Sequence, residues 1–311
     1  MIKVPFRPDK AEFAREMKPK ISGNNLNLEY QNIESSLYKV AAEIPDTISQ
    51  TIYDRLVDAF IAGDPAEPDK TAIDYLRRAM LHFALYEHAI FLITHISNDG
   101  ITVKKNDNET TAFKYQTDAL DNKLITTAWF WINQLIKYLN EHIKDFPKWA
   151  ESQQKQDSDN LPVDLSDFNK WVGVSLSGGE YFMIYIAWII REVWLDCVCS
   201  RIVEPVKTDA IARAVCYEVM GRACSILAYS ILPEPVRKDI DNEMGKNHRE
   251  QADRDIKERI SGKYLAKAET YWKAVDIEIK KNEIEENRKT ATDQPIIGRP
   301  YFSENDKFCM T

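Results

Sequence analysis

Residues 181–190 are the stretch that most constrains what this chain can fold into. They read YFMIYIAWII, ten residues without formal charge and almost all large and apolar. A helix that is apolar on every side has to be covered on every side, by the rest of the chain or by a partner. The stretch is too short to cross a bilayer, and Arg191, Glu192 and Asp196 follow it. We therefore expect a central helix sheathed by other helices, with no membrane span.

A five-residue motif, LSGGE, precedes this helix at Leu176–Glu180. It matches the signature of the ATP-binding-cassette ATPases, which contacts a nucleotide held by a P-loop. A P-loop has the pattern GxxxxGK[ST], and the sequence contains none. Ser177 followed three residues later by Glu180 is also the pattern of a capping box at a helix start. The motif therefore predicts that Ser177 caps the central helix, rather than a nucleotide contact.

Composition favours helices and limits the kind of partner. The chain has 311 residues, only 10 of them glycine, and a net charge of −8. That length allows one large or two ordinary domains, and nucleotide-binding α/β folds usually need more glycine in their turns. The negative charge argues against a protein whose main task is to grip nucleic acid. We predict a mainly α fold, a multi-helix bundle with long buried helices.

Hydrophobic periodicity divides the chain into five segments. Ile101 and Val103 alternate with polar residues before a turn at Asn106–Asn108, which predicts one small β-hairpin near 101–113. Ser261–Gly262 predicts a kink or break in a charged helical stretch with one apolar stripe.

The five segments are an N-terminal arm with a short helix (1–28), a first helical half with the hairpin (29–145), a polar linker (146–166), a second helical half (167–286) and an extended C-terminal tail (287–311).

No pattern in the sequence identifies a catalytic or metal-binding set. The five cysteines form no CxxC pair, and the five histidines form no HExxH motif. We therefore expect a protein that is not an enzyme, with no catalytic residues, no cofactor and no metal. One alternative stays open, which is a helical enzyme or ligand-binding domain with a pocket between long helices lined by His82, His88 and Trp131.

The two ends of the chain are unusually apolar. A terminus without a partner is normally polar and mobile, whereas both ends here combine apolar residues with proline in extended sequence. Such arms can dock on a neighbouring subunit or another protein, or they can fold back on their own domain. The predicted partner-binding residues are Ile2, Val4 and Phe6 at the N-terminus and Ile296, Ile297, Tyr301 and Phe302 at the C-terminus.

Several stretches carry a resemblance when taken in order. They are ISNDGITVKKN, AFKYQTDALDNKL, the continuation from Leu135 to His142, FPKWAES, YFMIYIAWIIREV and the closing LPEPV. Over roughly residues 28–280 the chain resembles a family of uncharacterised proteins that Bacteroidetes phages and prophages encode among their virion-structure genes. Its members are regarded as head–tail connector or adaptor components. The family has no established catalytic residues, so the resemblance assigns none.

The resemblance implies a structural virion protein that works through its interfaces. We expect a ring of identical subunits that docks on the portal protein and links it to the tail or to neighbouring connector proteins. An acidic lumen would let DNA pass without specific binding. The implied location is the phage neck in the virion, and the bacterial cytoplasm before assembly. A cytoplasmic protein-interaction module unrelated to phage is the remaining alternative.

Overall fold

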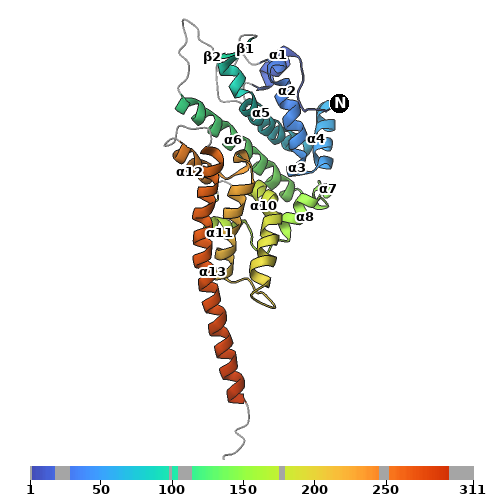
Figure 1. Cartoon of the computed structure of the whole chain (residues 1–311). Coiled ribbons are helices and arrows are strands. Elements are labelled where there is room, and N and C mark those ends of the chain that lie inside the picture. The colour runs from blue at the N-terminus through green and yellow to red at the C-terminus, as the bar shows by residue number, and fades with distance from the viewer. Residues whose placement is uncertain are drawn as a thin grey trace, which may run out of the picture.

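The computed structural model describes residues 2–17, 29–97, 100–103, 114–174, 179–244 and 252–293, and it is mainly α-helical, as predicted (Figure 1). The first part of the chain contains α1 (Lys10–Met17), α2 (Tyr30–Glu43), α3 (Pro45–Ile48), α4 (Gln50–Ala62), α5 (Asp69–Ile93), β1 (Thr94–Ser97) and β2 (Gly100–Val103). The second part contains α6 (Lys114–Glu141), α7 (Pro147–Ala150), α8 (Gln153–Asp159), α9 (Leu165–Trp171), α10 (Glu180–Val193), the π-helix η1 (Trp194–Cys199), α11 (Asp209–Ile226), the 3-10 helix η2 (Tyr229–Ile231), α12 (Glu234–Met244) and α13 (Ala252–Asp293).

One continuous hydrophobic core joins the two predicted halves. Two pairs of long helices dominate it, since α5 packs along α6 and α11 packs along α13. Helix α10 connects the pairs through contacts with both α6 and α11. Buried residues from α2 to α13 belong to the same cluster, including Leu37, Leu76, Leu135, Ile186 and Ile260. Because each fully buried aliphatic side chain contributes about 1.5–3 kcal/mol, this shared core holds the body together as one unit.

Helix α10 confirms the prediction of a buried central helix, but its covering is incomplete. Most of its apolar side chains are buried among α3, α6, α8 and α11, Ile186 and Ile189 completely. Trp188, however, is 48% exposed. The expectation that neighbours cover every side is therefore wrong on one face, because the surrounding helices do not cover the face that carries Trp188.

The start of α10 differs from the predicted capping box. The N-cap residue is Gly179, and Ser177 lies outside the described residues. The backbone N–H of Gly179 donates to the Glu180 carboxylate (3.0 Å), and the N–H of Tyr181 donates to Oδ1 of Asn133 on α6 (3.1 Å). One free amide of the first turn is thus satisfied by a side chain from another helix, a partner that local sequence does not reveal.

The β-hairpin does not lie where the sequence predicted it. The second strand, β2, contains Ile101 and Val103 as expected, but it pairs antiparallel with β1, with Thr94 opposite Val103. The predicted partner strand falls in residues 104–113, which lie outside the described residues.

The predicted polar linker is partly helical and anchored to the body. Helices α7 and α8 lie within it, and the side chains of Phe146 and Trp149 are fully buried. Nε2 of Gln154 donates to the carbonyl of Pro45 (3.2 Å), and Arg191 of α10 pairs with Asp157 (2.6 Å). Two aromatic anchors among many polar residues are enough to fix this segment, although its average composition resembles that of a loop.

Helix α13 runs without interruption through the predicted break at Ser261–Gly262. Oγ of Ser261 donates to the carbonyl of Gly221 on α11 (2.6 Å). A Cβ atom at Gly221 would lie 2.5 Å from Cδ2 of Leu265, so only glycine allows this approach of the two helices. The small residues at this point therefore serve close helix packing, and the prediction of a kink is wrong.

The N-terminal arm folds back on the body. Val4 and Phe6 are buried, Phe6 lies edge-on to Phe13 (6.4 Å between centroids), and the Tyr53 hydroxyl donates to the carbonyl of Lys3 (2.8 Å). Of the three predicted N-terminal docking residues, only Ile2 is exposed. For Val4 and Phe6 the prediction of partner binding is thus corrected to the alternative of self-docking. The physical reason is that the core of the same chain can bury these apolar side chains, so they need no partner.

Candidate functional site: a projecting helix and a charged pocket

Helix α13 is the feature that most distinguishes the outline of the molecule. Its 42 residues correspond to about 63 Å at a rise of 1.5 Å per residue. It starts beside α12, packs along α11 and continues well beyond the end of the body (Figure 1). The buried residues of its stripe end at Val275, and all residues from 280 to 285 are exposed.

The exposed end of α13 carries two isoleucines on one line. Ile277 and Ile284 are 55% and 54% exposed. They are seven residues apart, close to two full turns, and at about 100° per residue Ile277 lies roughly 200° around the helix from Val275. We call the line through Ile277 and Ile284 the outer face of α13. It points away from the stripe that packs on α11, so α11 cannot cover it.

The segment 194–208 forms the edge of the body beside the middle of α13. Arg201 connects the two, because its Nε lies 3.2 Å from Oδ1 of Asp276 and its guanidinium stacks 4.9 Å from the centroid of the Trp272 ring. Apolar side chains point to solvent here as well, and Val203 is 98% exposed. Leu195 and Val206 are also exposed. In the region where α13 leaves the body, an ion pair whose arginine stacks on a tryptophan ring therefore lies beside exposed apolar side chains.

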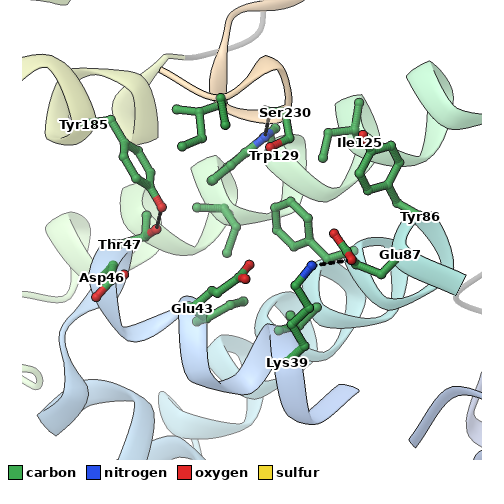
Figure 2. A pocket seen from close by; sticks show the side chains of 16 residues that line it. Lys39, Glu43, Asp46, Thr47, Tyr86, Glu87, Ile125, Trp129, Tyr185 and Ser230 are labelled. Carbon is green, nitrogen blue, oxygen red and sulfur yellow. Dashed lines mark hydrogen bonds and ion pairs between the residues drawn. The ribbon is translucent and has the colours of Figure 1, made fainter. Parts of the chain in front are cut away.

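A pocket of about 340 Å³ lies between the N-terminal helices and the α6–α10 region (Figure 2). Helices α2, α3, α5, α6 and α10 and the segment around η2 all contribute to it. Its size falls at the lower end of the range for small-molecule sites. The lining residues are Lys39, Val40, Glu43, Ile44, Asp46, Thr47, Phe83, Tyr86, Glu87, Ile125, Trp129, Ile132, Tyr185, Ala228, Ser230 and Ile231.

Hydrogen bonds hold the walls of this pocket in place. Nε1 of Trp129 donates to the carbonyl of Ser230 (2.6 Å), and the ring of Trp129 stacks on Tyr181 at 4.0 Å. The hydroxyls of Thr47 and Tyr185 lie 3.1 Å apart. Because these bonds connect α6 to η2 and α3 to α10, the pocket is built from segments that are distant in the sequence.

The charged groups lie along one side of the pocket. Lys39 of α2 pairs with Glu87 of α5, and this hydrogen bond raises the pKa of the Lys39 ammonium. Burial raises the pKa of the Tyr185 hydroxyl, the Thr47 hydrogen bond opposes that change, and Asp46 and Glu43 add to it. Burial also raises the pKa of Tyr86. Both tyrosines therefore keep their protons at neutral pH.

The residues that the sequence proposed for a pocket lie elsewhere. His82 is buried, with Nδ1 2.7 Å from the carbonyl of Arg78, and burial lowers its pKa. His88 lies beside Phe91. Trp131 stacks on Tyr75 and is covered by the guanidinium of Arg78. Trp129 faces the pocket instead, since it lies two residues before Trp131 and two residues turn a helix by about 200°.

Sequence reasoning missed the charged residues of the pocket. Lys39 and Glu43 are four residues apart on one helix, which places them on the same face. That spacing was the available signal, but nothing local indicated that Glu87 and Tyr185 would meet this face. The tertiary packing of α2 against α5, and of α3 against α10, brings them together.

The remaining sequence predictions concern metals, cysteines and the C-terminal tail. In the parts of the chain that the structure describes, no three metal-ligating side chains come together. Cys216 and Cys224 are buried free thiols, Cys197 is half-buried and Cys199 is exposed. The predicted docking residues Ile296, Ile297, Tyr301 and Phe302 lie outside the described residues. Among the described helices, none is long and apolar enough to cross a membrane.

Fold and site together define a mainly α-helical protein with one continuous core, a projecting C-terminal helix and a charged pocket. Residues 43–159 and 206–288 match a family of unknown function (DUF6712), and these segments cover more than half of the chain, which therefore belongs to this family. The matched segments include α5, α6, α11 and most of α13, and they omit α10. No curated protein and no solved structure matches the chain.

Proposed function

We propose that this protein is a non-enzymatic structural subunit of a phage virion, a head–tail connector or adaptor. In this role it forms a ring of identical subunits, docks on the portal protein and links it to the tail or to neighbouring connector proteins. The virion neck is its site of action, and the bacterial cytoplasm its location before assembly. The resemblance in sequence motifs supports the phage assignment, and one structural observation supports an interface-based function.

That observation is the exposed end of α13. A solitary helix in water gains little from its own backbone, and most helix stability in proteins comes from packing an apolar face. Residues 280–285 are all exposed, yet Ile284 among them and Ile277 two turns before it form an apolar line on the outer face. A neighbouring subunit that covers the outer face would supply the missing packing. In a closed ring this head-to-tail contact is repeated at every subunit, so the outer face of each subunit is covered by its neighbour.

The charge of the chain fits the same role. A net charge of −8 repels a passing DNA duplex rather than binding it, which is the property needed in a channel lining. We propose no specific DNA contact.

The experiment is co-expression of the full chain with a phage portal protein, followed by native mass spectrometry. We expect a ring-shaped assembly on the portal. In the double variant Ile277→Asp/Ile284→Asp that assembly should be lost, because two charges then occupy the outer face. The matched control is Ile61→Asp on α4, an isoleucine that is 58% exposed on another part of the body. A stable monomer that ignores the portal and is missing from phage particles would contradict the proposal.

The second candidate is a helical ligand-binding domain or enzyme, and the pocket beside Trp129 is the observation that favours it. The two functions make different demands on the chain. A ligand-binding protein needs the pocket residues and tolerates changes to α13, whereas a connector needs the outer face of α13. Assembly that survives the α13 double variant, combined with loss of ligand binding on changing the pocket, would favour this second candidate.

A further inference from the structure

The pocket between α2, α5, α6 and α10 combines aromatic walls with an acidic edge. Four aromatic side chains line it, namely Phe83, Tyr86, Trp129 and Tyr185. Phe83 lies edge-on to Trp129 (4.8 Å), and so does Tyr185 (5.9 Å), so the rings form a connected wall. Aromatic walls favour flat apolar groups, and the faces of such rings also attract cations.

The acidic edge is only partly neutralised. Three carboxylates, those of Glu43, Asp46 and Glu87, line the pocket against the single ammonium of Lys39. Lys39 already pairs with Glu87. In Figure 2 the side chain of Glu43 extends from α2 into the space between Tyr185 and Lys39. Two negative charges therefore remain next to the aromatic wall.

The field of these carboxylates reaches groups on both sides of the pocket. Glu43 helps to raise the pKa of Lys39 on α2, after Glu87 as the larger cause. Glu43 and Asp46 together help to raise the pKa of Tyr185 on α10, where burial is the largest cause. A ligand between α2 and α10 thus meets negative potential from one side and ring faces from the other.

We propose that this pocket binds a small organic cation, an amidinium, guanidinium or amine head group carried on a flat apolar body. The body occupies the space along Phe83, Trp129 and Tyr185, and the head group lies at the edge between Glu43 and Asp46. Planar amidinium and guanidinium groups donate paired hydrogen bonds to carboxylates, which are the strongest class of such bonds in proteins.

Other ligand classes fit this pocket less well. An anion would face two uncompensated carboxylates, and Lys39 is already paired. A metal ion needs several ligands that converge on one point, and no such group of three occurs among the described residues. An extended organic cation does not need ligands that converge on one point, and it does not need an unpaired basic side chain. This inference does not depend on the connector function, since it concerns a different face of the molecule.

Calorimetric titration of the full chain with matched probes tests the proposal. Benzamidine, benzamide and benzoate share one shape and differ in charge. We expect benzamidine to bind at least about tenfold more tightly than the other two at low salt, a ratio that corresponds to about 1.4 kcal/mol. The affinity should fall as salt is added, because Glu43 and Asp46 lie at the exposed edge. N-acetyl-arginine amide, run in parallel, shows whether an arginine side chain of another protein serves as well as a free amidine.

Two charge-matched variants locate the binding. Glu43→Gln/Asp46→Asn should weaken benzamidine binding by about tenfold or more, since both partners of the head group lose their charge. Glu278→Gln/Glu285→Gln, on the exposed end of α13, changes the net charge equally and should leave the affinity unchanged. Equal binding of benzoate or benzamide, no binding of benzamidine or the arginine amide, or equal effects of the two double variants would overturn the proposal. The probe comparison needs only the unmodified chain, so a variant that fails to fold does not prevent a decision.

Discussion

Helix α13 has two parts with a similar content of charged residues and opposite surroundings. In the packed part, residues 256–279, a stripe of apolar side chains is buried against α11, and Ser261 and Gly221 bring the two backbones close together. In the projecting part, residues 280–293, every side chain that the structure describes is exposed. Both parts are rich in Lys and Glu. The comparison teaches that charge content does not decide whether this helix is packed.

The difference has a physical consequence for each part. The packed part takes its stability from burial, so changes there affect the free energy of unfolding of the whole body. The projecting part can rely only on local interactions between residues three or four apart, which are worth only a few tenths of a kcal/mol each. We expect mutations in the buried stripe of the first part to change stability, and mutations on the outer face, at Ile277 and Ile284, to change assembly.

The largest expected effect is that of Ile260→Ala. Ile260 is buried in the packed part of α13, and removing such a side chain usually costs about 2–5 kcal/mol through lost burial and the cavity left behind. Urea unfolding followed by circular dichroism measures the loss. An effect below about 1 kcal/mol would mean that the α11–α13 contact is loose, and the packed part would then not differ from the projecting part in its contribution to stability.

A somewhat smaller loss is expected for Gly221→Ala. The new Cβ would meet Leu265 at 2.5 Å and its backbone nitrogen at 3.3 Å, and overpacking of this kind costs about 1–3 kcal/mol. Alanine is the better helix former by about 1 kcal/mol, so a stabilised variant in the same urea assay would show that the helices separate easily. Gly262→Ala is the matched control, because a Cβ there meets nothing within 4 Å. That control should be neutral or slightly more stable.

Alkaline pH should destabilise the packing of α11 against α13, because α11 carries two buried thiols. Burial raises the pKa of Cys224 on α11 to about 12 from an ordinary value near 9. Above pH 9 the unfolded chain loses this proton while the folded chain keeps it, so the free energy of unfolding falls between about pH 9 and 12. At pH 10 the loss should reach about 1 kcal/mol.

Urea unfolding at pH 8 and pH 10 checks this, and thiol labelling adds an independent test. In a Cys309→Ser background, a thiol reagent should modify the exposed Cys199 first and the buried Cys216 and Cys224 only on unfolding. Rapid native labelling of Cys224 would show that α11 is accessible, contrary to its packing against α13.

The smallest expected effect on stability comes from the outer face. Ile284→Ala should change the free energy of unfolding of the isolated chain by no more than about 0.5 kcal/mol, since the side chain is exposed. The same urea assay applies, beside Ile260→Ala as the buried counterpart on the same helix. A loss comparable to that of Ile260→Ala would show that the outer face is already covered by another copy under the conditions used.

Much of the architecture follows from the sequence because periodic apolar residues define helices locally. The burial of the 181–190 stretch was predicted from its uninterrupted apolar run, the one-sided stripe of α13 from spacing, and the helical class from periodicity together with the low glycine content. The errors share one cause. The hairpin at 101–113, the break at Ser261–Gly262 and the docking role of Val4 and Phe6 were inferred from local sequence, and contacts with distant segments overrode it.

The candidate site shows the same boundary between local and tertiary information. The sequence alone determined that long amphipathic helices would form and that α13 would carry one apolar stripe, because periodicity and turn residues act within a few positions. Only the tertiary structure decided that Lys39, Glu87, Trp129 and Tyr185 line one pocket and that α13 packs on the body along only part of its length. Such contacts depend on how helices far apart in the chain pack together, and that packing is a property of the whole core.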